Sequence, residues 1–293
     1  MQVNVYLPLL LSLVLAFCAP LVTRRLQPAI GARVLTIGAV LVALASTWGL
    51  VLLSLTLLDL TPLVRERAPV ADPVPTIVAA SALVLLTAGA WRALRAARVR
   101  AQADGALREI CRLCPPHSEL AVLEDPGAHA YAVPGRPGRI LVSSGLLRTT
   151  TPKDRQVVLA HERAHLRHRH HELRALTEIA AAFNPLLTPA RSAVAYLVER
   201  WADEVAACET GSRPLTAAAL ARVALTAPSS RAAVPGLAFH RHAVVERVVA
   251  LQTPIPPARW ALASATLGLA ALTAACAADA TVAFGRLLCQ LLA

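Results

Sequence analysis

Residues 157 to 171 carry five histidines, and two of them have the spacing of a metal-binding pair. His161 and His165 are four residues apart, so on a helix both project from one face and can bind the same zinc ion. Glu162 is offset by one residue and points beside the metal. There it can accept a proton from the attacking water and later give it to the leaving amine. The pattern His-Glu-x-x-His is nevertheless short enough to occur by chance.

A catalytic zinc ion needs a third protein ligand and an open fourth position. The segment VERWADE supplies two acidic side chains one helical turn apart, Glu199 and Asp203. The stretch from His165 to Glu199 suits a helix, a turn and a returning helix, and an Asn-Pro pair lies where the turn is needed. We therefore predict one zinc ion per chain, bound by His161, His165 and Glu199. The alternative is that these are polar side chains on exposed helices.

Three short apolar runs precede the histidine-rich segment and predict β-strands. They are SELAVLED, AHAYAVP and GRILVSSGLL, and proline and glycine separate them. Strands followed by helices within a segment of ordinary domain size predict an α+β fold for the part of the chain that carries the site.

The histidine pair lies in a segment that begins with the signals of a helix N-terminus. Thr151 suits the N-cap, Pro152 suits the first helical position, and an acidic residue follows where a capping box needs one. We expect one helix from Pro152 to about Leu173. The three later histidines diverge around such a helix, so we expect them to be solvated or to contact lipid headgroups. These are His168, His170 and His171.

The chain is too apolar for an ordinary soluble protein, since 56% of its residues are hydrophobic and its mean hydropathy is +0.55. Four stretches lack any charge and have the roughly 17–25 residues that a membrane-spanning helix needs. They are Val5–Val22, Val34–Leu58, Val74–Trp91 and Trp260–Ala278. A further segment, Ala175–Val198, is apolar enough to enter the interface, but its charges and prolines argue against a full crossing.

Arginines are concentrated in residues 23–33 and after residue 91. Because basic residues stay in the cytoplasm, we expect both termini outside the cell membrane and the segment between the last two spans inside. The predicted protein is an α-helical integral membrane protein with about four transmembrane helices and a cytoplasmic α+β domain. Its parts are residues 1–91 with three spans, residues 92–258 with the zinc site, and residues 259–293 with the fourth span and a short external tail.

The net charge of +11 lies largely near the inner leaflet, so the lipid bilayer is the expected partner. Direct contact with nucleic acid is not expected, because the sequence contains no recognition module for it. The CRLC segment at 111–114 resembles half a zinc ribbon, but no second CxxC follows, and two small residues on a helix are the favoured interpretation.

The segments VVLAHERAHLRHRHH, FNPL and LVERWADEVA together resemble the BlaR/MecR-type membrane metallopeptidases over approximately residues 115–255. More distantly, they are similar to HtpX-like and CAAX prenyl proteases. The resemblance implies a gluzincin-type zinc endopeptidase, with Glu162 as catalytic acid/base and Asp203 orienting a ligand histidine. It also implies that His240 or His242, in HRHAVVERVVAL, stabilises the transition state.

Gluzincins generally bind the peptide as an added strand along a sheet edge. Arg139–Ser143 is the predicted strand nearest the histidine helix in the sequence, so we expect it to line that edge. The alternative is an internal strand with both edges paired. The chain departs from the family in two respects. Where the family usually carries a basic residue and then an aspartate after the second ligand, this chain has His168 and His170. The β-lactam sensors also place a penicillin-binding domain after the last span, and here only a short tail follows. The activating signal is therefore expected from another protein or from a ligand of the spans and loops.

Two classes of function are consistent with these residues. In the first, the chain is a zinc endopeptidase that cleaves a cytoplasmic or membrane-proximal protein. A BlaI/MecI-like winged-helix repressor is the substrate that the resemblance suggests, and misfolded membrane protein is the HtpX-like alternative. In the second, the chain is a non-catalytic sensor or scaffold that keeps zinc for structure. Glu162 favours the enzyme, because a structural zinc site needs no general base.

Overall fold

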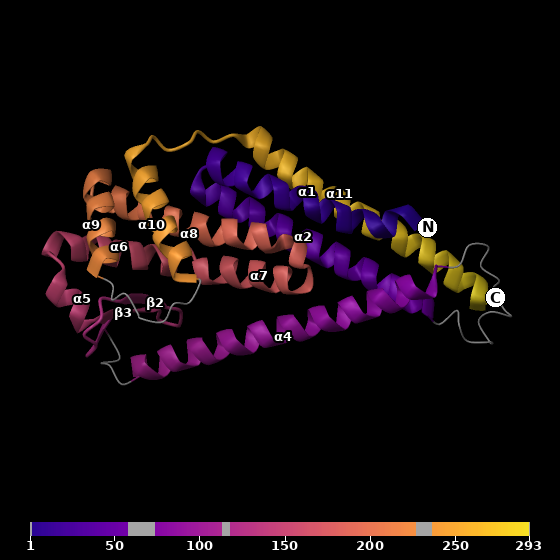
Figure 1. Ribbon diagram of the computed structural model, residues 1–293, viewed down its shortest axis with the longest axis horizontal. Coiled ribbons are helices and arrows are strands. Elements are labelled where there is room, and N and C mark those ends of the chain that lie inside the picture. Colours follow the sequence, from indigo (N-terminus) through magenta and orange to yellow (C-terminus); the bar gives the residue numbers. More distant parts are fainter. Residues whose placement is uncertain (1, 58–73, 113–117, 227–235, 293) are drawn as a thin grey trace.

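The computed structural model describes residues 2–57, 74–112, 118–226 and 236–292. Long helices extend from one end of the elongated molecule, and a small sheet with shorter helices forms the other end (Figure 1). Within the described ranges, four helices are long and apolar enough to cross a membrane, as expected for a multi-pass membrane protein. They are α1 (Gln2–Arg25), α2 (Pro28–Leu55), α4 (Thr76–Arg112) and α11 (Trp260–Leu292).

Each of the four apolar stretches predicted from the sequence coincides for most of its length with one of these helices, although Leu58 lies outside the described residues. α2 lies at their centre, where it packs against α1, α4 and α11. In α2, 61% of the most apolar segment is buried, against 22–28% in the other three helices. Small residues let neighbours approach α2 closely, since a Cβ added at Gly31 would lie 3.1 Å from the Leu197 side chain.

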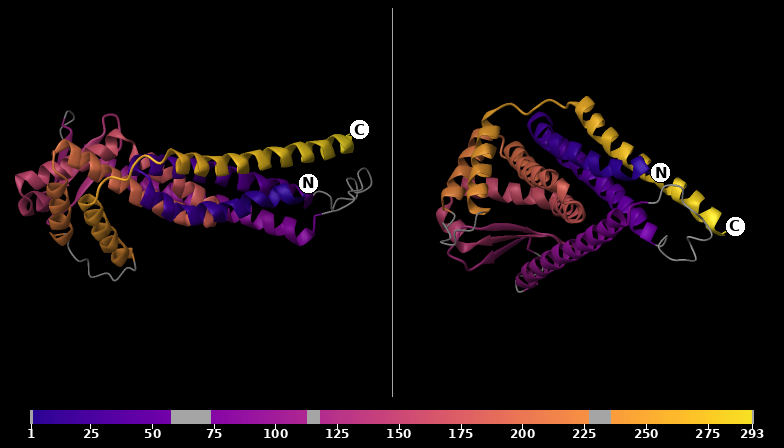
Figure 2. Two further views of the ribbon diagram at one scale, coloured as in Figure 1. Left: turned by 90° about the horizontal axis from the view of Figure 1, so that it is seen from above. Right: turned by 45° about the vertical axis from the view of Figure 1, so that its right-hand side comes forward.

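A helical hairpin from the region that carries the site packs among these long helices. Its arms are α7 (His170–Phe183) and α8 (Thr188–Glu209), and the short 3-10 turn η2 (Pro185–Leu187) joins them. Both arms contact α2, while α7 also contacts α4 and α8 also contacts α1. The views in Figure 2 show the long helices extending beyond this hairpin, away from the sheet.

Asn184 holds the tip of the hairpin and is only 5% exposed. Its Nδ2 donates hydrogen bonds to Ser12 Oγ of α1 at 2.7 Å and to Ser46 Oγ of α2 at 3.1 Å. Ser12 precedes Arg25, the last residue of α1, by 13 positions, which is about 20 Å of helix. The apolar segment Ala175–Val198 therefore packs well inside the bundle of long helices.

The three predicted strands are present as β1 (Leu120–Leu123), β2 (Ala130–Val133) and β3 (Arg139–Ser143). Their order is β1-β3-β2, with β3 parallel to β1 and antiparallel to β2. The expectation that Arg139–Ser143 forms a sheet edge is therefore wrong, and β1 and β2 are the edges within the described residues. The physical reason is that β1 and β2 occupy both edges of β3, which closeness to the histidine helix in the sequence does not reveal. Ile140, Leu141 and Val142 of β3 are all buried.

α6 (Pro152–Arg167) begins as predicted, with Thr151 and Asp154 forming a capping box. It does not continue to residue 173, because Arg169 adopts left-handed backbone angles, φ 53° and ψ 41°, which turn the chain. A second helix, α7, starts at the next residue. The prediction of one continuous helix is therefore wrong. The remaining helices at this end of the molecule are α5 (Ser144–Thr149), α9 (Arg213–Thr226) and α10 (Gly236–Gln252).

Candidate metal centre and active site

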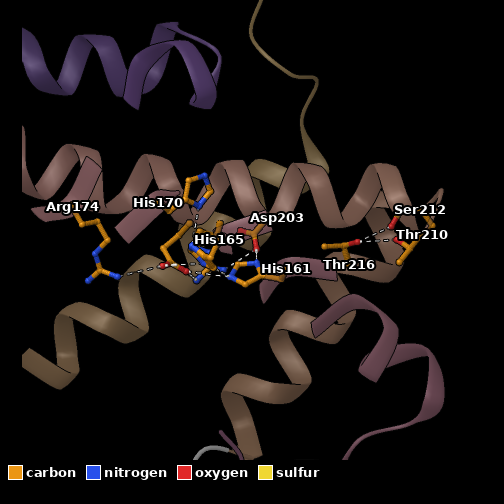
Figure 3. Close-up of polar contacts among 10 residues, drawn as sticks. His161, His165, His170, Arg174, Asp203, Thr210, Ser212 and Thr216 are labelled. Atoms are coloured by element: carbon orange, nitrogen blue, oxygen red, sulfur yellow. Dashed lines mark hydrogen bonds and ion pairs between the residues drawn. The ribbon is translucent and has the colours of Figure 1, made fainter. Parts of the chain in front are cut away.

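α6 and α8 bring together three side chains that can bind a metal ion. α6 presents His161 and His165 from one face, and their Nε2 atoms lie 3.1 Å apart (Figure 3). Glu199 on α8 faces both rings, with Oε2 3.5 Å from His161 Nε2 and Oε1 3.7 Å from His165 Nε2. The three residues that the sequence suggested as ligands thus converge on one point.

These donors fit a zinc ion. Two imidazoles and one carboxylate are a ligand set of catalytic zinc sites, with bonds of about 2.0–2.2 Å, so tetrahedral ligand atoms lie roughly 3.3–3.5 Å apart. The observed separations of 3.1–3.7 Å bracket that range. Across the described ranges, this is the only group of three or more histidine, cysteine, aspartate or glutamate residues close enough to share an ion. Three protein ligands leave one position for a reacting molecule.

The carboxylate of Asp203 and the guanidinium of Arg247 contact two of the candidate ligands. Asp203 Oδ1 lies 3.0 Å from His161 Nδ1, so His161 can donate from Nδ1 and keep its Nε2 lone pair for the metal. Arg247 of α10 donates to both oxygens of Asp203, each at 2.7 Å, and its Nη1 lies 3.3 Å from Glu199 Oε2. One guanidinium therefore holds both acidic side chains of the centre.

The charges of these groups shift one another's pKa values. Burial alone would lower the pKa of His161, but the carboxylates of Asp203 and Glu199 raise it to about 10. Burial would raise the pKa of Glu199, yet the hydrogen bond from His161 and the charge of Arg247 hold it well below its usual range. Burial lowers the pKa of His165 to about 4, so its ring is neutral near pH 7.

Glu162 lies between the ligand cluster and the sheet. Burial is the main cause that raises the pKa of its carboxyl group, opposed by the positive charge of His161. The backbone of Ala132 in β2 lies near this carboxyl group and acts to lower the same pKa. Glu162 is therefore held beside the metal centre at the sheet edge, with a proton affinity above that of an ordinary glutamate.

The model of one protein family, described as peptidase family M48, matches residues 93–253, more than half of the chain. The chain belongs to peptidase family M48. M48 proteins are membrane-type zinc metallopeptidases, which agrees with four apolar helices beside a His-His-Glu cluster. No curated protein and no solved structure matches the chain.

His170, which was expected to be solvated, lies beside the candidate metal centre of this M48 peptidase. His170 is 1% exposed, and its Nδ1 is 2.9 Å from His165 Nδ1. The expectation that it is solvated is therefore wrong, because the turn at Arg169 directs the chain back toward α6. His168 stacks on Trp201 with ring centroids 4.6 Å apart.

Arg247 is the residue of the M48 centre that sequence reasoning missed. In its segment, HRHAVVERVVAL, the resemblance points to the histidines and gives no role to the arginine. The sequence does not show that this arginine faces Asp203 and Glu199, because that contact depends on how α8 and α10 pack together. His240 and His242 belong to the same helix, α10, but their side chains lie outside the described residues. Cys111 is buried, and Cys114 lies outside the described residues as well.

Proposed function

We propose that this M48 peptidase is a membrane-embedded zinc endopeptidase. His161, His165 and Glu199 are the ligands, and Glu162 is the general acid and base. The observation that carries the proposal is the convergence of three potential ligand atoms from α6 and α8 beside a partly buried glutamate near a sheet edge. A site that held zinc only for structure would need a fourth protein ligand and no base.

A bound zinc ion would polarise the scissile carbonyl group and make the attacking water more acidic. Glu162 accepts the proton of that water, and its raised pKa brings it closer to the operating pH. It then delivers this proton to the nitrogen of the leaving amine. Asp203 orients His161 through Nδ1, and Arg247 offsets the negative charge of Asp203 and Glu199.

The substrate strand is proposed to lie along β2, whose outer side is unpaired within the described residues. The hydrogen bond from Ser143 N–H to His129 C=O shows which residues of β2 face β3. In an antiparallel pair these alternate, so the N–H and C=O groups of Ala130 and Ala132 point to the free edge. Ala132 lies next to Glu162, which brings an added peptide strand to the catalytic carboxylate.

The position of the site relative to the start of α2 supports substrates that are cleaved close to the membrane. Leu197 lies just before Glu199 on α8 and packs against Gly31, near the start of α2. Trp201 lies just after it, under the guanidinium of Arg33 at 4.4 Å from the ring centroid. The metal centre is thus level with the end of a membrane-spanning helix. We propose two candidate substrates for testing, a BlaI/MecI-like repressor and a misfolded membrane protein.

We also propose that the site faces the cytoplasm and that both termini are external. The arginine distribution is the basis for this orientation. It is supported by the position of the start of α1 and the end of α11 at the end of the molecule opposite the sheet (Figure 1). The division into residues 1–91, 92–258 and 259–293 remains part of this proposal.

Glu162→Gln tests the function, because glutamine keeps the size of the side chain but cannot take up a proton. Zinc content and cleavage are measured on the same detergent-solubilised preparation, with a candidate repressor and an unfolded membrane protein as substrates. The variant should retain zinc and lose about 10²–10⁴-fold in rate. Parental cleavage by zinc-loaded Glu162→Gln would remove Glu162 from the mechanism. Absence of cleavage by the parent on every substrate would favour the non-catalytic scaffold.

A further inference from the structure

His170 is a buried polar residue to which the proposed mechanism assigns no task. It is the first residue of α7, follows the left-handed Arg169, and is 1% exposed. Its Nδ1 lies 2.9 Å from Nδ1 of His165, which is hydrogen-bonding distance (Figure 3). One of these two nitrogens must therefore donate a hydrogen and the other must accept it.

The direction of this hydrogen bond follows from the other end of the His165 ring. Nε2 of His165 faces Nε2 of His161 and the carboxylate of Glu199, which is the position of the metal. A histidine that binds a metal through Nε2 carries its proton on Nδ1. His165 is therefore the donor, His170 Nδ1 is the acceptor, and the proton of His170 sits on its Nε2.

The surroundings of His170 agree with that assignment. Its Nε2 is buried and has no hydrogen-bond partner in the part of the chain that the structure describes. Such an atom costs stability, so its retention calls for an explanation. The ring packs instead against Trp201, with centroids 4.7 Å apart at a tilt of 52°. An N–H group tolerates an aromatic neighbour better than an unshared lone pair does, because the ring face is negative.

Trp201 contacts both His170 and α2, one of the long apolar helices. The guanidinium carbon of Arg33, on α2, lies 4.4 Å from the ring centroid of Trp201. His168 stacks on the same indole at 4.6 Å. His170 is thus held in place by an aromatic stack that α2 covers.

We propose that His170 is a positioning residue for the metal centre, which accepts the Nδ1 hydrogen of His165 and so fixes that ligand in its metal-binding tautomer. His161 is oriented by a carboxylate, Asp203, whereas His165 is oriented by a neutral ring. This inference rests on the proposed zinc site, but it concerns the ligand geometry and not the catalytic step.

The test measures zinc affinity of the full-length protein in detergent by competition with a chelating dye. His170→Phe removes the acceptor and should weaken zinc binding about 10–100-fold, as expected for the loss of a ligand's outer partner. His170→Asn places an amide oxygen near the position of Nδ1 and should keep most of the affinity. His171→Ala, a partly buried neighbour that does not contact the ligands, is the matched control and should leave zinc affinity unchanged.

Three outcomes distinguish failure of the proposed metal site from failure of the proposed role of His170. Full zinc binding by His161→Ala would overturn the metal site itself. Loss of zinc by His161→Ala, with unchanged affinity in His170→Phe, would overturn only the role of His170. Equal losses in His170→Phe and His170→Asn would also overturn the acceptor role. Thermal unfolding of the zinc-free variants shows whether each one is folded.

Nitrogen-15 NMR of the zinc-loaded parent protein tests the same point without any substitution. The expected spectrum has His165 protonated at Nδ1 and His170 protonated at Nε2. A proton on Nδ1 of His170 would make His170 the donor and would overturn the proposal, whatever the variants show.

Discussion

Arg247 places a positive charge beside the buried carboxylate of Asp203 and the partly buried carboxylate of Glu199 at the candidate metal centre. It is 11% exposed and contacts both Asp203 and Glu199. Removing one partner from a buried ion pair costs about 3–5 kcal/mol, because the remaining charge is left uncompensated. Whether this arginine positions the ligands can be tested on the zinc-free protein, where the protonated ring of His161 is the other positive charge beside the carboxylates.

Arg247→Leu should therefore lower the free energy of unfolding of the zinc-free protein by about 3–5 kcal/mol. It should also weaken zinc binding, because Glu199 loses its support. The control is Arg163→Leu, which removes an exposed ion pair with Glu119 and should cost no more than about 1 kcal/mol. Chemical unfolding monitored by tryptophan fluorescence gives both values. Equal effects of the two substitutions would argue against a special role for Arg247.

The protonation of His161 sets the pH dependence of metal binding. Its pKa in the folded chain is about 10, above the ordinary value of 6.5. The protonated ring stabilises the folded chain fully below pH 6.5, and this contribution is lost as pH rises through 10. A metal ion must displace that proton, so zinc affinity should rise about tenfold per pH unit between pH 6 and 8. Dye competition at several pH values measures it, and a constant affinity would contradict the pairing with Asp203.

At the scale of elements, β2 is an edge strand among the described residues and β3 is not, so β2 is the strand that we propose for the substrate. Ala130→Pro removes an N–H group that points to the free edge, and proline is tolerated at such positions. The variant should fold and bind zinc, but its kcat/KM should fall about tenfold through the lost main-chain hydrogen bond. Val122→Pro, on the opposite edge strand β1, should leave cleavage unchanged. Unimpaired cleavage by folded Ala130→Pro would mean that the substrate binds elsewhere.

The hairpin of α7 and α8 is the element that connects the metal centre to the membrane helices. Its tip is fixed by Asn184 between α1 and α2, and its base carries His170 on one arm and Glu199 on the other. A shift of α2 relative to α6 would therefore displace one ligand and the partner of another. Through these contacts, a movement of α1 or α2 would change the positions of Glu199 and His170.

At the scale of the whole molecule, the orientation in the membrane is the main prediction. Reporter fusions at Ala103, on α4, and after Ala293 should give opposite signals, cytoplasmic and external respectively. The reason is the excess of arginine in residues 23–33 and after residue 91. Fusions after Leu26, at the cytoplasmic end of α1, provide an internal control that should match Ala103. Matching signals at Ala103 and Ala293 would show that the number of spans is wrong.

Local patterns in the sequence were sufficient for several features of this protein. Four apolar helices follow from runs without charge, and the start of α6 follows from Thr151 and Pro152, because each depends on neighbouring residues. The spacing of His161 and His165 likewise predicts one face of a helix. Glu199 was found by its chemistry and its distance along the chain, and the structure places it beside the two histidines.

Other features were decided only by the tertiary structure, because they depend on residues far apart in the sequence. β3 is central since β1 and β2 pair with it on both sides, and no local pattern reveals strand order. Arg247 reaches the centre from α10, 44 positions after Asp203. His170 faces His165 because a single left-handed residue, Arg169, ends α6 and redirects the chain. Such backbone angles are uncommon in a residue other than glycine, and the exposed Arg169, which forms an ion pair with Glu172, gives no local signal of the turn.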